Sequence, residues 1–318
     1  TWQAGRAAVT VTGGAFGEVT FADPSNVQLT GGSFEKIAVS GASAVSLSAL
    51  LANGYAFYST SGAYQSAEGT ELSNVRVQRH THAIDADGKC TECGAAFGAS
   101  VTARGGGASD VSYYDTIDSA FAAAHEGDTV TLLANITTFE SNTCVSGGPY
   151  IFDLNGHQIA ARGKELVVGN DVRGKLTVKD SSENHTGYVQ YLKLQSGDLT
   201  VESGSFHQII ETGSDSVGTI TVKGGTADEV KHTSAGVTFR LSGGTFDYVG
   251  NIVGGKAGDL LAAGYAYAKK DNPNVIENGY AADYSAVSNV TVVKHDHTWN
   301  DGACACGVSC AHSEMNST

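Results

Sequence analysis

The chain has 318 residues and a net charge of −14 at pH 7, with 41 glycines, 3 prolines and only 16% charged residues. So little proline excludes collagen and proline-rich disorder. The acidic balance, with 19 scattered lysines and arginines, argues against nucleic acid and anionic membranes as partners. No apolar run approaches the roughly 18 residues of a membrane span, so we expect no membrane insertion within this segment. The chain starts directly in strand-like sequence, which indicates a fragment of a longer protein.

A short pattern recurs along the chain: an alternating apolar strand, then Gly-Gly or Ser-Gly, a small residue and usually Phe. It occupies residues 9–16, 27–34, 199–206, 220–227 and 239–246. Within each of the two groups of copies, neighbours start 18 to 21 residues apart, and a fixed period near 20 is typical of a solenoid. We therefore predict an all-β parallel β-helix whose glycine corners adopt positive φ. The alternatives are an antiparallel sandwich, for which the spacing is too long, and a leucine-rich repeat, whose Leu/Asn signature is missing.

A longer repeat overlies the short one. Residues 50–57 resemble residues 260–267, and residues 73–82 resemble residues 288–297. This repeat predicts two tandem modules with short helices near residues 47–53 and 116–126, the latter a capping helix with Thr116 as its N-cap. The first predicted module ends within residues 1–79 and is followed by a Cys/His element, residues 80–94, and a linker, residues 95–111. A complete second module is predicted over residues 112–294. Residues 295–318 are predicted to hold a second Cys/His element and the start of a further repeat.

Histidine and cysteine cluster after the last strand of each predicted module. The first group is His80, His82, Cys90 and Cys93, and the second is His295, His297, Cys304 and Cys306, followed by Cys310 and His312. Two imidazoles and two thiolates are donors that tetrahedral Zn²⁺ prefers, and four protein ligands describe a closed structural site. Disulfides are the alternative in an oxidising compartment, although a Cys-x-Cys disulfide is strained. In the second group, either Cys304 or Cys310 would bind the zinc ion together with Cys306.

Three segments of the second predicted module resemble a known family. Residues 114–133, 150–159 and 176–182 are similar to the opening of pectate-lyase-like right-handed parallel β-helix modules in large surface proteins of Gram-positive bacteria. Residues 297–312 resemble the tandem zinc-knot-like His/Cys arrays of such proteins. The resemblance implies a right-handed solenoid in a multi-module extracellular protein, located at the bacterial cell surface or secreted. Its motifs specify the fold well and the activity poorly.

Catalytic residues are not evident in the sequence. The fold family contains lyases and glycoside hydrolases, which need clustered or paired carboxylates, and Asp153 and Asp180 are the nearest candidates. We expect Asp153 to face solvent or to bond the following Asn-Gly turn, and Asp180 to be a turn residue. Four isolated histidines are expected at the surface or in turns: His157, His185, His207 and His232. Cys144 is expected to be a lone buried thiol, and no catalytic residue is assigned.

A set of aromatic residues is the best candidate for ligand contact, because tyrosine rings stack on sugars and anchor protein interfaces at little entropic cost. The set is Tyr55, Phe57, Tyr58, Tyr64, Tyr265, Tyr267, Tyr280 and Tyr284. Packing at the solenoid end is the alternative role.

The function expected from these features is a non-catalytic, monomeric, adhesin-like module that binds a host glycan or host protein, such as a mucin or an immunoglobulin, or an environmental ligand. A β-helix carbohydrate-active enzyme is the first alternative. A structural stalk is the second.

Overall fold

The structure is a computed structural model that describes residues 8–40, 45–52, 54–107, 110–138, 141–276 and 284–295, and the backbone of residues 299–300 and 303–304. The chain divides into two compact units, an N-terminal unit of residues 1–96 and a C-terminal unit of residues 97–318. Within the described ranges, no helix is long and apolar enough to cross a membrane.

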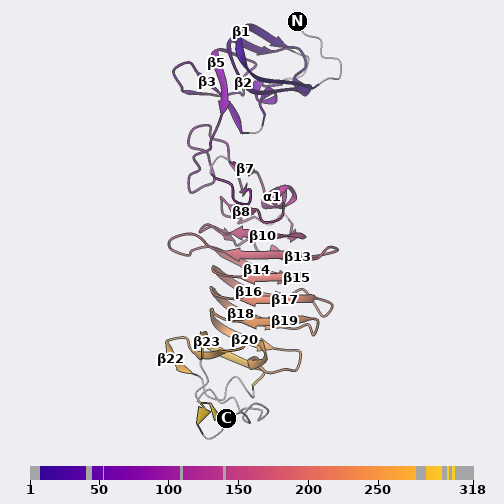
Figure 1. Ribbon diagram of the computed structural model, residues 1–318, viewed down its shortest axis with the longest axis vertical. Helices are drawn as coiled ribbons and strands as arrows, with labels where there is room; N and C mark the ends of the chain where they lie inside the picture. Colours follow the sequence, from indigo (N-terminus) through magenta and orange to yellow (C-terminus); the bar gives the residue numbers. More distant parts are fainter. Residues whose placement is uncertain are drawn as a thin grey trace, which may run out of the picture. The chain divides into compact units, whose positions relative to one another are not determined.

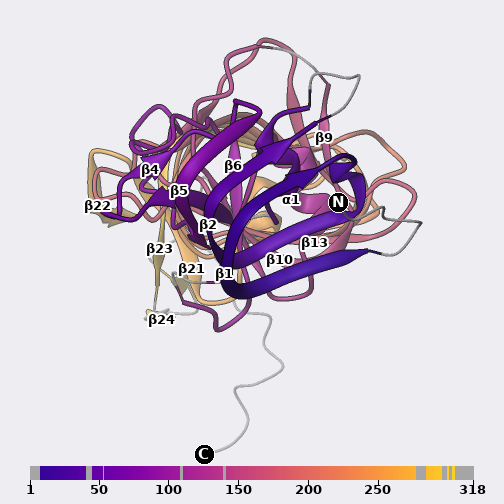
Figure 2. The ribbon, with the colours of Figure 1, turned by 90° about the horizontal axis from the view of Figure 1, so that it is seen from above.

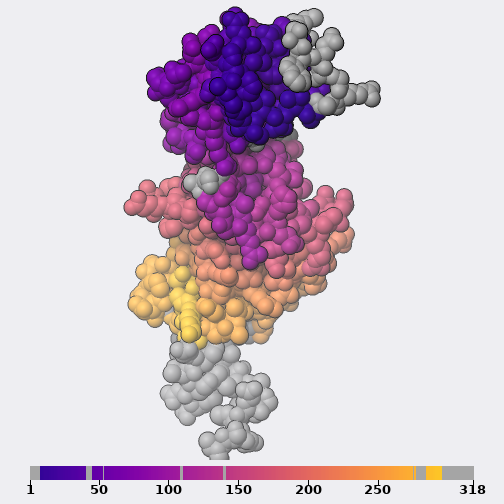
Figure 3. Space-filling view, turned by 45° about the horizontal axis from the view of Figure 1, so that its top comes forward, coloured from indigo at the N-terminus to yellow at the C-terminus, as the bar shows by residue number. Residues whose placement is uncertain are grey.

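The C-terminal unit is a parallel β-solenoid, in which successive coils stack on one another (Figure 1). Its eight-stranded sheet contains β6 (Ala99–Thr102), β7 (Val111–Tyr114), β8 (Thr129–Leu132), β10 (Gly147–Asp153), β13 (Gly174–Lys179), β15 (Ser196–Val201), β17 (Val217–Val222) and β19 (Val237–Leu241). Its ten-stranded sheet contains β9 (Thr143–Val145), β12 (Glu165–Val168), β14 (Tyr188–Leu194), β16 (Ser205–Glu211), β18 (Thr226–His232), β20 (Thr245–Asn251), β21 (Tyr265–Lys269), β22 (Asn272–Ile276) and β23 (Ala286–Lys294), with β11 (Gln158–Ile159) paired to β14. In Figure 3 the sequence colours of this unit follow one another in bands, as a coil-by-coil stack requires.

Alternate residues of each strand fill the interior of the solenoid. Leu199 in β15 lies between Leu176 in β13 and Ile220 in β17, and all three are buried. Between β15 and β16 the chain turns at Gly204, whose φ is +110°, which confirms the predicted positive-φ corners. Each coil has one strand before this corner and one after it, and the two strands belong to different sheets. One period of about 20 residues therefore contributes one strand to each sheet.

The first end of this solenoid is covered by helix α1 (Ile117–Ala123). Thr116 is its N-cap, as predicted: its hydroxyl accepts a hydrogen bond from the backbone N–H of Ser119. Ile117, Ala120 and Phe121 point into the core. The helix ends earlier than predicted, with Ala124 as its C-cap. Strand β6 lies inside the segment predicted as a linker and pairs antiparallel with β8.

The N-terminal unit has one mixed sheet in the order β1-β2-β5-β3-β4, and Figure 2 shows β1, β2 and β5 side by side. Its elements are β1 (Val9–Phe21), a 3-10 turn (Pro24–Asn26), β2 (Val27–Val39), a 3-10 turn (Leu47–Leu50), β3 (Tyr55–Ser59), β4 (Tyr64–Gln65) and β5 (Glu71–Arg79). β1 and β2 are parallel, whereas β5 runs antiparallel to both β2 and β3.

The longer sequence repeat corresponds to one structural arrangement that occurs in both units. Phe34 of β2 faces Val75 of β5, and Phe246 of β20 faces Val290 of β23. A 3-10 turn and a short strand precede the closing strand each time, with Ala257–Leu260 and β21 as the second copy. These closing strands are antiparallel to the strands they cover, so the parallel ladder ends there in each unit. The short strands β3 and β21 still run in the direction of β2 and β20, because each pairs antiparallel with the same closing strand. The chain therefore reverses between the short strand and the closing strand, which cannot complete another parallel coil.

Candidate metal centre

The first His/Cys group forms a compact cluster in the N-terminal unit. His80 follows directly on β5, and its backbone N–H donates to the carbonyl of Gly54 at 2.8 Å. His82 stands two residues further, and the two imidazole rings meet edge to face with centroids 4.3 Å apart. His80 and Cys90 are buried, while His82 and Cys93 are half-buried. The end of a sheet strand therefore fixes one half of the cluster.

A small hairpin supplies the two cysteines. An Asx turn at Asp85 reverses the chain, because its carboxylate accepts from the N–H groups of Asp87 and Lys89, both at 2.9 Å. The Cys90 N–H donates to the carbonyl of Ala95, and the Gly94 N–H donates to the carbonyl of Cys90. The hairpin thus closes into a tight knuckle around the two sulfur atoms.

The donor atoms have the separations that a tetrahedral ion needs. Cys90 Sγ lies 3.4 Å from His80 Nε2, and Cys93 Sγ lies 3.5 Å from His82 Nδ1. All four donors lie within 4.8 Å of one another. Zinc bonds of about 2.0 Å to nitrogen and about 2.3 Å to sulfur place neighbouring tetrahedral donors about 3.5 Å apart. Both cysteines are free thiols, so the group fits a Zn²⁺ ion with four protein ligands.

The electrostatics of the cluster suit a cation. Burial lowers the pKa of His82 to about 4, helped by the adjacent His80, and burial also lowers the pKa of His80. Both imidazoles are therefore neutral and able to donate a lone pair at neutral pH. Burial disfavours the Cys90 thiolate, but backbone N–H groups of Cys93 and Glu92 outweigh it and hold its pKa below the ordinary value. Burial raises the pKa of Cys93, with the neighbouring Cys90 adding to the rise.

Tyr58 and Glu92 contact His80 on the side of its ring that faces away from Cys90. The sequence analysis did not connect these two residues with the cluster. The hydroxyl of Tyr58 contacts His80 Nδ1 and also donates to Glu92 Oε2 at 3.4 Å. Burial and Glu92 raise the pKa of Tyr58 to about 12, so the phenol keeps its proton. The spacing of residues along β3 gives no signal of this contact, because it arises only when β3 pairs with β5.

The second His/Cys element is described only in part. The His295 N–H donates to the carbonyl of Gly264 at 2.9 Å, as His80 does to Gly54. β24 (Trp299–Asn300) pairs antiparallel with β25 (Ala303–Cys304). Of the other predicted ligands, only the backbone of Cys304 is described. The rest lie outside the described residues: His297, Cys306, Cys310 and His312.

The predicted ligand-contacting aromatic residues divide by burial. Phe57 and Tyr267 are almost fully buried, so their burial supports the alternative role, packing at the solenoid end, rather than ligand contact. Tyr55, Tyr64 and Tyr265 are half-buried, and Tyr284 is exposed. Tyr280 lies outside the described residues. Contact with a ligand stays a prediction for the accessible rings.

The two carboxylates considered for catalysis hold corners of the solenoid. Asp153 Oδ1 accepts from the N–H groups of Asn155 and Ser181, both at 3.0 Å, so it bonds the turn instead of facing solvent. Asp180 accepts from Gly156 at 2.9 Å and Gly187 at 2.7 Å. Both side chains are buried. They are structural members of the coil corners.

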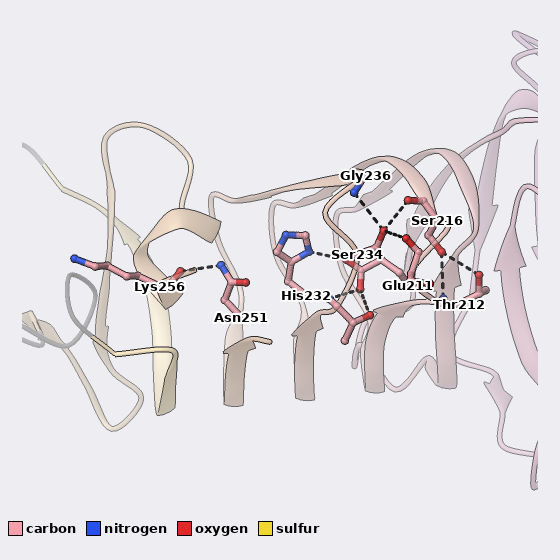
Figure 4. Close-up of polar contacts among 11 residues, drawn as sticks. Glu211, Thr212, Ser216, His232, Ser234, Gly236, Asn251 and Lys256 are labelled. Carbon is pink, nitrogen blue, oxygen red and sulfur yellow. Dashed lines mark hydrogen bonds and ion pairs between the residues drawn. The ribbon is translucent and has the colours of Figure 1, made fainter. Parts of the chain in front are cut away.

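Two further sequence assignments need correction. Cys144 is exposed, because the strand alternation of β9 turns Thr143 and Val145 inward and Cys144 outward. His232 is mostly buried, with its Nδ1 2.7 Å from the carboxylate of Glu211, which has no exposed side-chain surface. Figure 4 shows this pair at the ends of β16 and β18, with Asn251 at the end of β20. His232 therefore belongs to a polar column in the coil corner, not to the surface.

Comparison of the chain with models of protein families, with curated proteins and with solved structures finds no match. The assignment of the site therefore rests on its donor set and geometry.

Proposed function

We propose that the chain is a non-catalytic part of an extracellular bacterial surface protein, in which the first His/Cys cluster is a structural zinc centre and the solenoid presents a binding surface. The observation that carries the proposal is the closed four-donor cluster of His80, His82, Cys90 and Cys93. Four protein ligands leave no position for substrate or water, which is characteristic of structural zinc. Placed directly after β5, the ion would tie residues 80–94 to the end of the sheet.

The binding role is supported by the resemblance to surface-protein modules and by the structural use of Asp153 and Asp180, whose hydrogen bonds occupy them in corners. A host glycan or a host protein is the proposed partner. The accessible rings of Tyr55, Tyr64 and Tyr265 are the first positions to examine for contact.

The test combines metal analysis with binding and turnover assays on the whole chain. We expect at least one zinc per chain after purification without chelator, and binding on an array of glycans and host proteins. Less than one zinc, or a Cys90–Cys93 disulfide, would overturn the metal centre. Turnover of a polysaccharide would replace the binding role with an enzymatic one, and absence of any ligand would favour a structural stalk.

A further inference from the structure

Tyr58 contacts both the His/Cys cluster and the carboxylate of Glu92. Its side chain comes from β3, is 6% exposed, and reaches His80 Nδ1 on the side of the ring away from Cys90. Glu92 Oε2 lies 3.4 Å from the phenol oxygen and 3.4 Å from His80 Nδ1. Strand pairing of β3 with β5 thus brings a hydroxyl to the back of a metal ligand.

The proton count of this contact determines the state of the imidazole. A phenol has one hydrogen, and Tyr58 donates it to Glu92. The phenol oxygen therefore accepts from His80 Nδ1–H, which leaves Nε2 with its lone pair directed at the cluster. Metal-bound histidines commonly donate their second ring N–H to a polar partner that fixes tautomer and ring orientation.

We infer that Tyr58, supported by Glu92, is the positioning residue of this centre: it holds His80 with Nε2 toward the ion. The inference rests on the proposed zinc centre. Tyr64 provides an internal contrast, because its ring lies 5.6 Å from the same imidazole but its hydroxyl is not the group at Nδ1.

In the described part of the second copy of the repeat, the position that corresponds to Tyr58 carries no hydroxyl group. Tyr58 pairs with Arg76 in the β3–β5 ladder, and the corresponding position in the β21–β23 ladder is Ala268, which pairs with Thr291. An alanine has no hydroxyl to orient a histidine.

The experiment measures zinc affinity by chelator competition in the whole chain, with the cysteines of the second element replaced by serine so that one site reports. Tyr58→Phe keeps the ring and removes the hydroxyl, Glu92→Gln changes a half-exposed side chain, and Tyr248→Phe in β20 of the other unit is the control. We expect about 10-fold to 100-fold weaker binding for Tyr58→Phe, a smaller loss for Glu92→Gln, and an unchanged affinity for Tyr248→Phe.

Nitrogen NMR of the histidine rings supplies the readout that a merely structural tyrosine would not change. We expect His80 to be protonated at Nδ1 in the wild-type chain and to populate both tautomers in metal-free Tyr58→Phe. An unchanged zinc affinity or an unchanged tautomer in Tyr58→Phe overturns the inference. A wild-type chain that binds no zinc overturns the proposed centre itself, so the two failures are distinguishable.

Discussion

At the scale of single residues, Asp180 shows how a buried carboxylate holds a solenoid corner. Burial alone would raise its pKa, but hydrogen bonds from the backbone N–H of Gly187 and from Ser182 and Gly156 outweigh burial and hold the pKa below the ordinary value. These donors come from two successive coils, so one side chain joins neighbouring layers. A charged acceptor that serves several buried N–H groups contributes more than a neutral hydrogen bond.

Asp180→Asn is expected to destabilise the C-terminal unit by about 2 kcal/mol at neutral pH, because the amide turns one N–H donor group toward backbone donors. The folded pKa is lowered, so the contribution of Asp180 is present above its unfolded pKa and is lost as the pH falls through the folded pKa. The difference between wild type and variant should therefore shrink in acid. Chemical unfolding at neutral and acidic pH measures it, with exposed Asp171→Asn as control; an equal loss at both pH values would contradict this account.

At the scale of elements, a glycine column lets the coils approach closely. Gly174, Gly197 and Gly218 pair in register across β13, β15 and β17. A Cβ on Gly197, where φ is +118°, would lie 1.9 Å from the carbonyl oxygen of Gly174. Gly213 is exposed and has open space at that position. Backbone contact between coils, rather than turn geometry alone, therefore requires glycine in this column.

Gly197→Ala should destabilise the solenoid by about 3 kcal/mol, since it combines backbone strain with overlap that packed strands cannot relieve. Gly213→Ala is the matched control and should change the unfolding free energy by less than about 0.5 kcal/mol. Thermal unfolding of the two variants makes the comparison. Equal midpoints for both would show that the coils can separate locally at little cost.

Removing the metal should loosen one element and leave the coil stack intact. Structural zinc contributes about 10–16 kcal/mol in zinc-finger peptides, whereas the hairpin of residues 80–94 contributes one buried hydrophobic residue, Cys90, to the core. Chelation, or Cys90→Ser with Cys93→Ser, is expected to raise amide exchange in residues 80–94 and to leave circular dichroism dominated by strand. Loss of the strand signal on chelation would mean that the sheet itself depends on the ion.

Sequence periodicity predicted the elements that repeat and missed those that depend on tertiary pairing. The corner at Gly204 and the N-cap at Thr116 follow from local chemistry, and the sequence pattern also predicted which four residues form the His/Cys cluster. The antiparallel direction of β5 was not predictable, because the sequence repeat shows which residues form strands but not in which direction each strand runs. Tyr58 was predicted to contact a ligand, while its hydroxyl contacts His80; only the pairing of β3 and β5 reveals that.

At the scale of the whole molecule, each unit has a core of its own. The C-terminal core is one continuous cluster from Ala99 to Val292, and the N-terminal core runs from Val27 to Val77. Within the solenoid, Leu199 touches the coils before and after it and no others in the ladder. Stability is therefore approximately a sum of nearest-neighbour interfaces along the stack.

This one-dimensional arrangement predicts graded protection from amide exchange along the C-terminal unit. Strands β15–β18 have a coil on both sides and should exchange most slowly, while the edge strands β7 and β22 should exchange fastest, because end strands can open without disturbing the centre. Hydrogen exchange read by mass spectrometry resolves the gradient. Gly197→Ala should then accelerate exchange first in β13, β15 and β17, the coils that meet at that position. Uniform exchange of all coils, unaltered in pattern by the substitution, would show instead that the solenoid opens only as a whole.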